Sequence, residues 1–391
     1  MKKKIAILGS TGSIGKTLLK ILKKNKKNFV IEFLSANKDY KTLLKQAKDF
    51  NVRNIVITNK QSFQIALDNL KNKPNNISVH NNFNNLNKIF PKKIDYVMSS
   101  IVGLDGLIPT FKIIKFTKKI AIANKETIIC AWNLIKKELK KNKTEFIPVD
   151  SEHFSLWYGL KNINLNIIDK IYITASGGPF FKTPIKKLKN VSIKQALKHP
   201  NWNMGNKISI DSATMINKIY EVIEAKNIFN IPYRKIKILI HPSSYVHAIV
   251  KSNNGLIKII AHDTTMKIPI FNTLYFDSIR HLNSNKLNIK LLNNLNLMEV
   301  DQKKYPMVKI LQNLSDKHTL YDTVIVSAND ALVNLYLKKQ INFIDIQKKL
   351  FQLIKSKQFL KYKKIYPTKI KDILDLNKYV RLKIMEKVYK S

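Results

Sequence analysis

The chain has 391 residues, of which 45% are apolar, so we expect roughly two or three domains with hydrophobic cores of their own. Its 70 Lys and Arg residues outnumber 26 Asp and Glu residues, and the net charge of +44 would suit nucleic acid or an anionic membrane surface. We exclude nucleic acid as the main partner, because lysine is spread along the whole chain and aromatic residues do not alternate with the basic runs.

Cysteine content and hydropathy indicate the cellular compartment of the protein. Cys130 is the only cysteine and lies in the apolar stretch TIICAW, so we expect a buried thiol and a reducing compartment. No apolar run approaches the roughly 20 residues that span a bilayer, and the apolar run near the start is too short for a signal peptide. We therefore expect a cytoplasmic protein that does not bind membranes.

The first 149 residues alternate between short apolar runs and helical stretches. The runs predicted as strands are 4–8, 30–36, 54–58, 94–100 and 119–124, and a further strand at 146–150 leaves this part of the chain. Such alternation is typical of βαβ units with a parallel sheet. The pattern predicts a doubly wound, Rossmann-like α/β domain over residues 1–149.

The remaining chain divides into three parts. Strand-like runs at 167–178 and 237–252 predict a central mixed α/β domain over residues 150–282. Residues 283–300 are rich in Asn, Lys and Leu and are predicted as a linker. Helical periodicity beyond them predicts a C-terminal helical bundle over residues 301–391.

Three of the ten glycines fall at Gly9, Gly12 and Gly15 in the run GSTGSIG, after a strand and at the start of a helix. Spaced glycines in this context allow a tight turn, a close approach of the backbone to pyrophosphate, and close packing of helix on strand. The spacing differs from the G-x-G-x-x-G of many NAD sites. A plain helix cap is the alternative, but it does not need three glycines.

The end of the second strand bears on the choice of cofactor. A carboxylate there favours NAD, whereas this chain has Ser35, Ala36, Asn37 and Lys38. A hydroxyl and a lysine suit the 2′-phosphate of NADP(H). Asp39 is a contrary signal.

Acidic residues are scarce, yet Asp150 and Glu152 stand two apart at the end of a predicted strand. Together with Glu221 they could form a site of three carboxylates, and hard oxygen ligands select Mg²⁺ or Mn²⁺. The alternative is that Asp150 or Ser151 simply caps the helix that follows.

The segment 210–221, IDSATMINKIYE, follows an apolar, strand-like run and is predicted to open a helix. Ser212 and Thr214 would place hydroxyls at the helix start, where free N–H groups favour anions. Asn217 and Glu221 share a face, with Lys218 beside them. The set suits a phosphate, and an ordinary N-capped amphipathic helix is the alternative.

Three further segments carry polar residues that suit a site. Ser176, in TASGGPF, precedes two glycines that could form an anion nest. The run HPNWNMG, residues 199–205, is predicted to be a mobile lid or a structural loop. The run 124–126, NKE, follows a strand at the sheet edge where ligands bind in such folds.

Together GSTGSIG, ANKE, DSEH, SGGPF, HPNWNMG and DSATMINKIYE resemble, in order and spacing, the 1-deoxy-D-xylulose 5-phosphate reductoisomerases. The resemblance covers essentially the whole chain. It implies rearrangement and NADPH-dependent reduction of 1-deoxy-D-xylulose 5-phosphate to 2-C-methyl-D-erythritol 4-phosphate, in the non-mevalonate route to isoprenoids. It also implies a homodimer and a divalent metal, Mg²⁺ or Mn²⁺, with Co²⁺ as a third candidate.

The resemblance implies roles for individual residues. The metal ligands would be Asp150, Glu152 and Glu221, and the catalytic residues would be Lys125, Glu152 and His199. The substrate would be bound by Lys125, Ser151, Glu152, Ser176, His199, Ser212, Asn217, Lys218 and Glu221. The cofactor would be bound by Thr11, Gly12, Ser13, Ile14, Ala36, Asn37, Lys38, Asn124, Glu126, Met204 and Gly205. Trp202 would belong to the lid.

Three positions depart from the family pattern. The family usually has glycine at the position of Asn37, asparagine at that of Asp39, and arginine at that of Lys267. Asn37 tolerates left-handed backbone, Asp39 would weaken binding of a 2′-phosphate, and Lys267 cannot make a bidentate contact. A simple NADP-dependent dehydrogenase without the isomerase step is the alternative enzyme.

Overall fold

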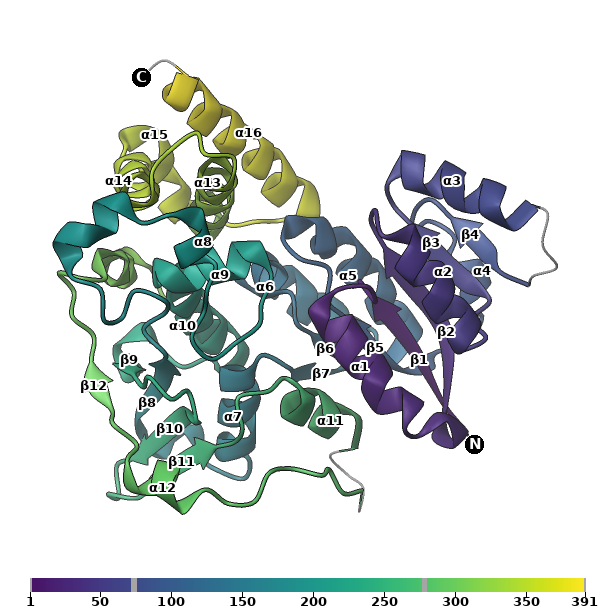
Figure 1. Cartoon of the computed structure of the whole chain (residues 1–391), viewed down its shortest axis with the longest axis horizontal. Helices are drawn as coiled ribbons and strands as arrows, with labels where there is room; N and C mark the ends of the chain where they lie inside the picture. Colours follow the sequence, from purple (N-terminus) through teal and green to yellow (C-terminus); the bar gives the residue numbers. More distant parts are fainter. Residues whose placement is uncertain (1, 72–75, 276–279, 390–391) are drawn as a thin grey trace. The chain divides into compact units, whose positions relative to one another are not determined.

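The computed structural model describes residues 2–71, 76–275 and 280–389. Two compact units make up the chain, and their elements are labelled in Figure 1. Unit 1 contains residues 1–127, 135–150 and 266–282, and unit 2 contains residues 128–134, 151–265 and 283–391.

Unit 1 is built on a seven-stranded sheet in the order β4-β3-β2-β1-β5-β6-β7, in which all neighbours are parallel. The strands are β1 (Lys3–Leu8), β2 (Phe29–Ala36), β3 (Asn54–Ile57), β4 (Ser78–His80), β5 (Ile94–Ser99), β6 (Thr117–Ile122) and β7 (Glu145–Pro148). The predicted doubly wound sheet is confirmed. Sequence analysis missed β4, which is only three residues long and not fully buried.

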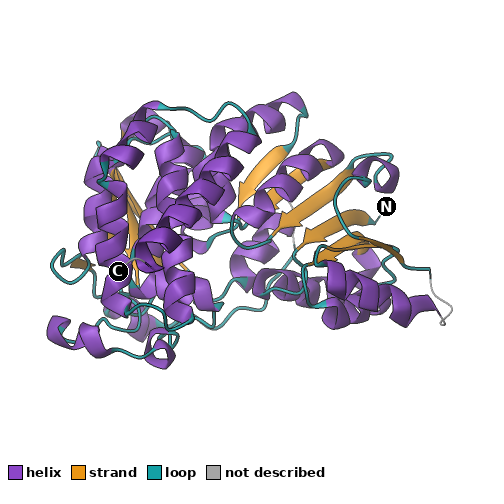
Figure 2. Ribbon diagram, turned by 90° about the horizontal axis from the view of Figure 1, so that it is seen from above, coloured by secondary structure: helices purple, strands orange, loops and turns teal. Residues whose placement is uncertain are grey.

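Helices cover this sheet (Figure 2). They are α1 (Ser13–Lys23), α2 (Tyr40–Asp49), α3 (Lys60–Lys71), α4 (Leu86–Ile89), α5 (Leu107–Ile113), α6 (Lys125–Lys141, shared between the units) and α11 (Lys267–Tyr275). In α1 the buried side chains Leu18, Leu19, Ile21 and Leu22 form one stripe, which packs with β1 and β2 in a single core.

Unit 2 contains a mixed sheet in the order β11-β10-β8-β9-β12. The strands are β8 (Ile168–Ala175), β9 (Ile236–Ile240), β10 (Val246–Ser252), β11 (Ile257–Ala261) and β12 (Met298–Glu299). Only β8 and β9 pair in parallel, which confirms the predicted mixed α/β architecture.

The helices of unit 2 are α7 (Ser151–Leu160), α8 (Ile193–Ala196), α9 (Asn206–Ala213), α10 (Ile216–Phe229), α12 (Ile289–Asn293), α13 (Leu320–Leu337), α14 (Phe343–Ile354), α15 (Lys357–Leu360) and α16 (Ile370–Tyr389). The last four form the predicted C-terminal bundle. In α13 nearly every residue is buried, because α14 and α16 both pack against it. Among the described residues, none of the helices is both long and apolar enough to cross a membrane.

The two units divide the chain differently from the expected domains. Residues 128–134, expected in the first domain, belong to unit 2, and the next division, after Asp150, lies close to the expected boundary. Residues 266–282, expected in the central domain, belong to unit 1, because Ile270, Phe271 and Leu274 of α11 join the core beneath α1. The expected linker contains α12 and β12.

Candidate active site

The turn between β1 and α1 requires two of its three glycines. Gly9 has φ +81°, and a Cβ on it would lie 2.9 Å from the carbonyl oxygen of Ser100. A Cβ on Gly15 would lie 2.5 Å from Cα of Ser10, so only glycine lets α1 pack this closely. The third, Gly12, is the exposed N-cap of α1, where free N–H groups favour an anion.

This turn lies where the strand order of the sheet reverses, between β1 and β5. Doubly wound sheets bind ligands at that point, beyond the carboxyl ends of the strands. The predicted cofactor residues Thr11, Gly12, Ser13 and Ile14 are all partly or fully exposed there. The local geometry therefore fits a dinucleotide pyrophosphate.

We expect Gly15→Ala to lower the free energy of unfolding by about 2 kcal/mol, because the added Cβ overlaps backbone that cannot move aside. Weaker NADPH binding should accompany this loss. Gly205→Ala is the matched control for stability alone, since a Cβ there meets open space, and it should cost less than about 1 kcal/mol. Urea unfolding compares the two variants, and NADPH titration compares Gly15→Ala with the wild type; equal losses of stability in the two variants would contradict the packing role of Gly15.

The end of β2 corrects one expectation. The hydroxyl of Ser35 does not face a nucleotide: the side chain is 1% exposed, and its oxygen accepts the Gly9 N–H at 3.0 Å. Ser35 therefore braces the glycine turn from beneath. Ala36 ends the strand, and Asn37 and Lys38 follow it with exposed side chains.

The two departures from the family pattern at this point have local explanations. Asn37 stays out of the left-handed region, so the missing glycine causes no strain. Asp39 is the N-cap of α2, where its carboxylate accepts the N–H of Thr42 at 3.1 Å. That carboxylate has a structural role in starting a helix.

Asn124 connects two loops at the edge of the same sheet. Its side-chain oxygen caps α6 by accepting the N–H of Thr127 at 2.6 Å. Its amide nitrogen donates to the carbonyls of Ile101 and Gly103, the latter at 2.6 Å. The contacts of Asn124 thus order the loop after β5, while Glu126 is buried in the first turn of α6.

The three predicted metal ligands gather at the start of α7. Asp150 directly precedes this helix, Glu152 lies in its first turn, and Glu221 lies on α10. One oxygen from each lies within 4.8 Å of the others. The ammonium of Lys125 is 3.3 Å from Asp150. Asp150 directly precedes a helix, as a helix-capping role would require. It also belongs to the cluster of three carboxylates.

Two side chains of the predicted phosphate set contact these carboxylates. Lys218 pairs with Glu152 at 3.0 Å and with Glu221, and the amide of Asn217 donates to Glu221 at 2.5 Å. Burial lowers the pKa of the Lys218 ammonium, but the two carboxylates outweigh burial and raise it above its ordinary value. The residues predicted to bind the phosphate therefore adjoin those predicted to bind the metal.

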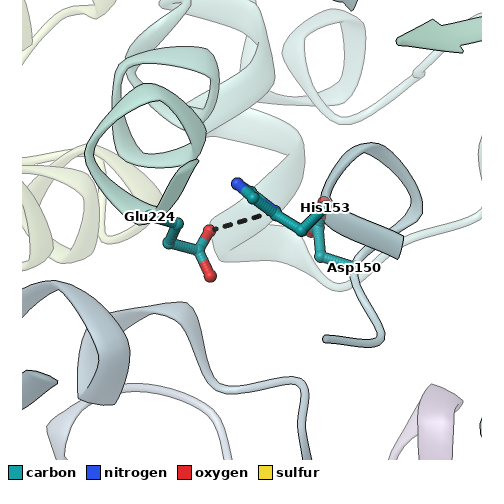
Figure 3. Close-up of side chains that lie close together, drawn as sticks. All are labelled: Asp150, His153 and Glu224. Carbon is teal, nitrogen blue, oxygen red and sulfur yellow. Dashed lines mark ion pairs between the residues drawn. The ribbon is translucent and has the colours of Figure 1, made fainter. Parts of the chain in front are cut away.

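A second layer behind the carboxylates was not predicted. His153 is fully buried, and its Nε2–H donates to the backbone carbonyl of Glu221 at 2.8 Å. Its Nδ1 lies 3.9 Å from the carboxylate of Glu224, the ion pair drawn in Figure 3. These contacts hold the backbone of Glu221, a predicted metal ligand, in place. Two features of the sequence could have predicted this layer: the histidine in the run DSEH, and Glu224, an acidic residue three positions after Glu221.

The glycines after Ser176 form the predicted nest in unit 2. Gly177 and Gly178 both have positive φ, and a Cβ on Gly178 would lie 2.8 Å from the carbonyl oxygen of Ser212. The Gly178 N–H donates to the Ser176 oxygen at 3.0 Å. The nest therefore lies directly against Ser212.

The segment 210–221 differs from its prediction. The apolar run before Ile210, predicted to be strand-like, is the first part of helix α9, and Ser212 lies in the last turn of this helix instead of at a helix start. A helix prevails because Lys207 reaches Asp211 one turn later, at 3.0 Å, and so pairs a carboxylate that is 1% exposed. Met215, with φ +68°, makes the corner from which α10 begins.

Both ring nitrogens of His199 are engaged. Nδ1 accepts the N–H groups of Asn201 and Trp202 at 3.2 and 3.0 Å, so the proton is on Nε2, which donates to Ser176 at 3.0 Å. Burial, and then the charge of Lys218, lower the pKa of His199 to about 4. At neutral pH this histidine is therefore an uncharged hydrogen-bond donor.

The rest of the 199–205 loop leads to α9. The ring of Trp202 meets that of His247 edge-on, with centroids 6.3 Å apart. Met204 is half-buried, and Gly205 is the N-cap of α9. The loop is thus joined to the helix that carries Ser212.

Family comparisons agree along the chain. The family described as 1-deoxy-D-xylulose 5-phosphate reductoisomerase matches residues 5–132. Its C-terminal domain matches residues 146–229, and a further DXP reductoisomerase C-terminal domain matches residues 263–383.

Individual relatives carry the same name. The 1-deoxy-D-xylulose 5-phosphate reductoisomerase of Pelagibacter ubique is 58% identical over 98% of both chains. That of Clostridium kluyveri is 41% identical over 79% of this chain and 80% of its own. A solved DOX-P reductoisomerase in complex with NADPH, fosmidomycin and magnesium has a TM-score of 0.89 at 29% identity, covering 99% of this chain and 98% of its own. The enzyme of Zymomonas mobilis in complex with NADPH has a TM-score of 0.86 at 28% identity and covers 99% of each chain. The chain belongs to the 1-deoxy-D-xylulose 5-phosphate reductoisomerase family.

Proposed function

We propose that this chain rearranges and reduces 1-deoxy-D-xylulose 5-phosphate to 2-C-methyl-D-erythritol 4-phosphate, with NADPH and a divalent metal ion. The single observation that carries the proposal is the cluster of Glu152, Glu221 and Lys218, with Asp150 directly before α7. A metal site and a phosphate-binding ammonium that share one cluster suit a small phosphorylated ketose. Relatives with the same name span the whole chain.

The donor set fits a hard cation. Asp150, Glu152 and Glu221 offer oxygen atoms within 4.8 Å of one another, the ligand type that Mg²⁺ and Mn²⁺ prefer. A bound ion would supply Lewis-acid polarisation of neighbouring substrate oxygens. The His153 hydrogen bond to the Glu221 carbonyl would keep α10 aligned while ligands exchange.

The remaining polar residues would bind and orient the substrate. Ser176, Ser212, Asn217 and Lys218 would hold the phosphate, away from the reacting carbons. His199 would donate through Nε2, and its low pKa of about 4 excludes a role as a protonated acid at neutral pH. We assign Lys125 and Ser151, together with Glu152, to the binding of the substrate hydroxyls.

Unit 1 would bind NADPH, which supplies the hydride. Thr11 to Ile14 would receive the pyrophosphate at the start of α1, and Ala36 to Lys38 would lie near the adenosine. Asn124 and Glu126 would order the sheet edge, and Met204 and Gly205 would contact the cofactor from their loop. Residues 1–149 would form the NADPH-binding part, with residues 266–282 packed in the same unit; residues 150–265 would form the catalytic part, and residues 283–300 the connection to the helical part, 301–391.

The test is NADPH oxidation by the purified protein with 1-deoxy-D-xylulose 5-phosphate, with and without Mg²⁺ or Mn²⁺. We expect oxidation that requires both substrate and metal, and a branched product. Oxidation without the metal would favour a simple dehydrogenase. A folded protein that binds NADPH but oxidises none would overturn the proposed function.

We also propose that the enzyme is a cytoplasmic homodimer. The single cysteine is buried, as a reducing compartment allows. Strand β11 is at the edge of its sheet, and Leu256, Ile257 and Ile259 on it or beside it are at least half exposed. An apolar edge strand of this kind is normally covered, and a second copy of the chain would cover it.

We expect light scattering to give twice the 45.3 kDa of one chain for the wild type and a lower mass for Ile259→Lys. The charge would be buried in the interface, where it costs more than the contact contributes. Ile65→Lys, at an exposed isoleucine of α3, is the control and should leave the mass unchanged. A monomeric wild type would contradict the dimer, and an unchanged mass for Ile259→Lys would contradict its location.

A further inference from the structure

A buried charged network in unit 2 lies outside the residues assigned to the reaction. The ammonium of Lys207, on α9, is 3.0 Å from Asp211 and 3.0 Å from Asp330, which lies on α13. The amide of Asn329, also on α13, donates to Asp211 at 2.7 Å. Arg381, on α16, reaches the other oxygen of Asp330 at 3.3 Å.

The centre of this network is buried and its cations reach the surface. Asp211 and Asn329 are at most 1% exposed, and each oxygen of the Asp211 carboxylate has its own partner. The side chains of Lys207 and Arg381 are 22% and 40% exposed, and these two cations balance the two carboxylates. A matched buried network of this kind specifies one arrangement of its helices, because breaking any member leaves a desolvated charge.

Its position links the C-terminal helices to the site. Asp211 directly precedes Ser212, and the Lys207 ammonium lies 5.5 Å from the ring centre of the buried Tyr220, which directly precedes Glu221. Between these two points the chain turns at Met215, whose left-handed φ of +68° costs about 1 kcal/mol. Contacts on both sides must therefore hold this corner in shape.

We propose that Lys207, Asp211, Asn329 and Asp330, here named the α9–α13 clamp, are positioning residues for substrate binding. Through the clamp, the C-terminal helix α13 holds the corner that carries Ser212, Asn217, Lys218 and Glu221. The clamp residues do not touch the substrate; they set the spacing of the groups that do. The proposal rests on the proposed function for the identity of the substrate.

Lys207→Met tests the clamp, because it keeps the side-chain stem and removes the charge. We expect the KM for 1-deoxy-D-xylulose 5-phosphate to rise about tenfold, as the loss of charged hydrogen bonds would cause. The Kd of NADPH should change much less than this, since most of the residues proposed to bind NADPH lie in unit 1 and only Met204 and Gly205 lie near Lys207. Lys207→Arg should restore most of the affinity. General destabilisation would instead lower the active fraction and leave KM unchanged.

Two further variants keep the test decisive. If Lys207→Met does not fold, Asp330→Asn replaces it; this change is the same size and should raise KM by a smaller factor. Lys383→Met is the control, because it breaks a 2.7 Å ion pair with Glu386 on α16, outside the clamp, and should leave KM unchanged. A KM for Lys207→Met or Asp330→Asn equal to that of the wild type would overturn the proposal.

Different results would overturn the proposed role of the clamp and the proposed function of the chain. Absence of turnover in the wild type would overturn the proposed function alone. The clamp is then judged by binding of inorganic phosphate, measured by calorimetry on the wild type and on Lys207→Met. Weaker phosphate binding in the variant would support the clamp, and equal binding would overturn it.

Discussion

Glu221→Gln is expected to lower kcat/KM for 1-deoxy-D-xylulose 5-phosphate by about a thousandfold, because it removes the charge of a proposed metal ligand. The amide preserves the size of the side chain and can still accept from Asn217. The loss should therefore reflect the metal. Steady-state NADPH oxidation across a range of Mn²⁺ concentrations would measure it, and saturation should need far more Mn²⁺ than in the wild type.

The same chemical change at an exposed site is the control. Glu386→Gln, on α16, breaks a surface ion pair with Lys383 and should leave both turnover and the Mn²⁺ requirement unchanged. If Glu221→Gln kept the turnover and metal dependence of the wild type, the assignment of Glu221 as a ligand would be wrong.

Lys218→Met is expected to have the second large effect. It should weaken binding of the substrate without weakening binding of the metal ion. We expect the KM of the substrate to rise about a hundredfold, because the phosphate loses a desolvated ammonium partner. Metal affinity without substrate should not fall, since Lys218 pairs with Glu152 and Glu221, two of the proposed ligands. Mn²⁺ titration followed by calorimetry separates the two effects.

The same substitution should lower the free energy of unfolding by about 3 kcal/mol, because it removes a cation that pairs with the buried carboxylate of Glu221 and the partly buried one of Glu152. The raised pKa of Lys218 means that this stabilisation is complete at pH 7 and is lost only above the ordinary value of 10.5. Added Mn²⁺ should restore more stability to Lys218→Met than to the wild type.

Lys119→Met provides the comparison for both measurements. It removes a lysine whose partner, Glu145, is mostly exposed, at 3.3 Å. It should change neither KM nor the response to Mn²⁺. A hundredfold loss of metal affinity in Lys218→Met would contradict the shared cluster, because Lys218 would then support the metal instead of occupying its ligands.

Local sequence patterns were sufficient for most secondary structure. The glycine spacing in GSTGSIG and the alternation of apolar runs depend on contacts between near neighbours, so they predict the nucleotide turn and the parallel sheet correctly. The same local logic failed at the apolar run before Ile210, which was expected to be strand-like and is the first part of α9. There the contact between Lys207 and Asp211, one helical turn apart, prevails.

The sequence by itself determined the family, the chemical nature of the site residues and the order of the elements, because these follow from motifs and from short-range periodicity. Only the tertiary structure decided which side chains meet. Lys218 and Glu152 are 66 positions apart, and Asn329 and Asp211 are 118 apart. No periodicity relates such positions. The burial that pairs them, lowers the pKa of His199 and turns Ser35 inward arises only when separate elements pack together.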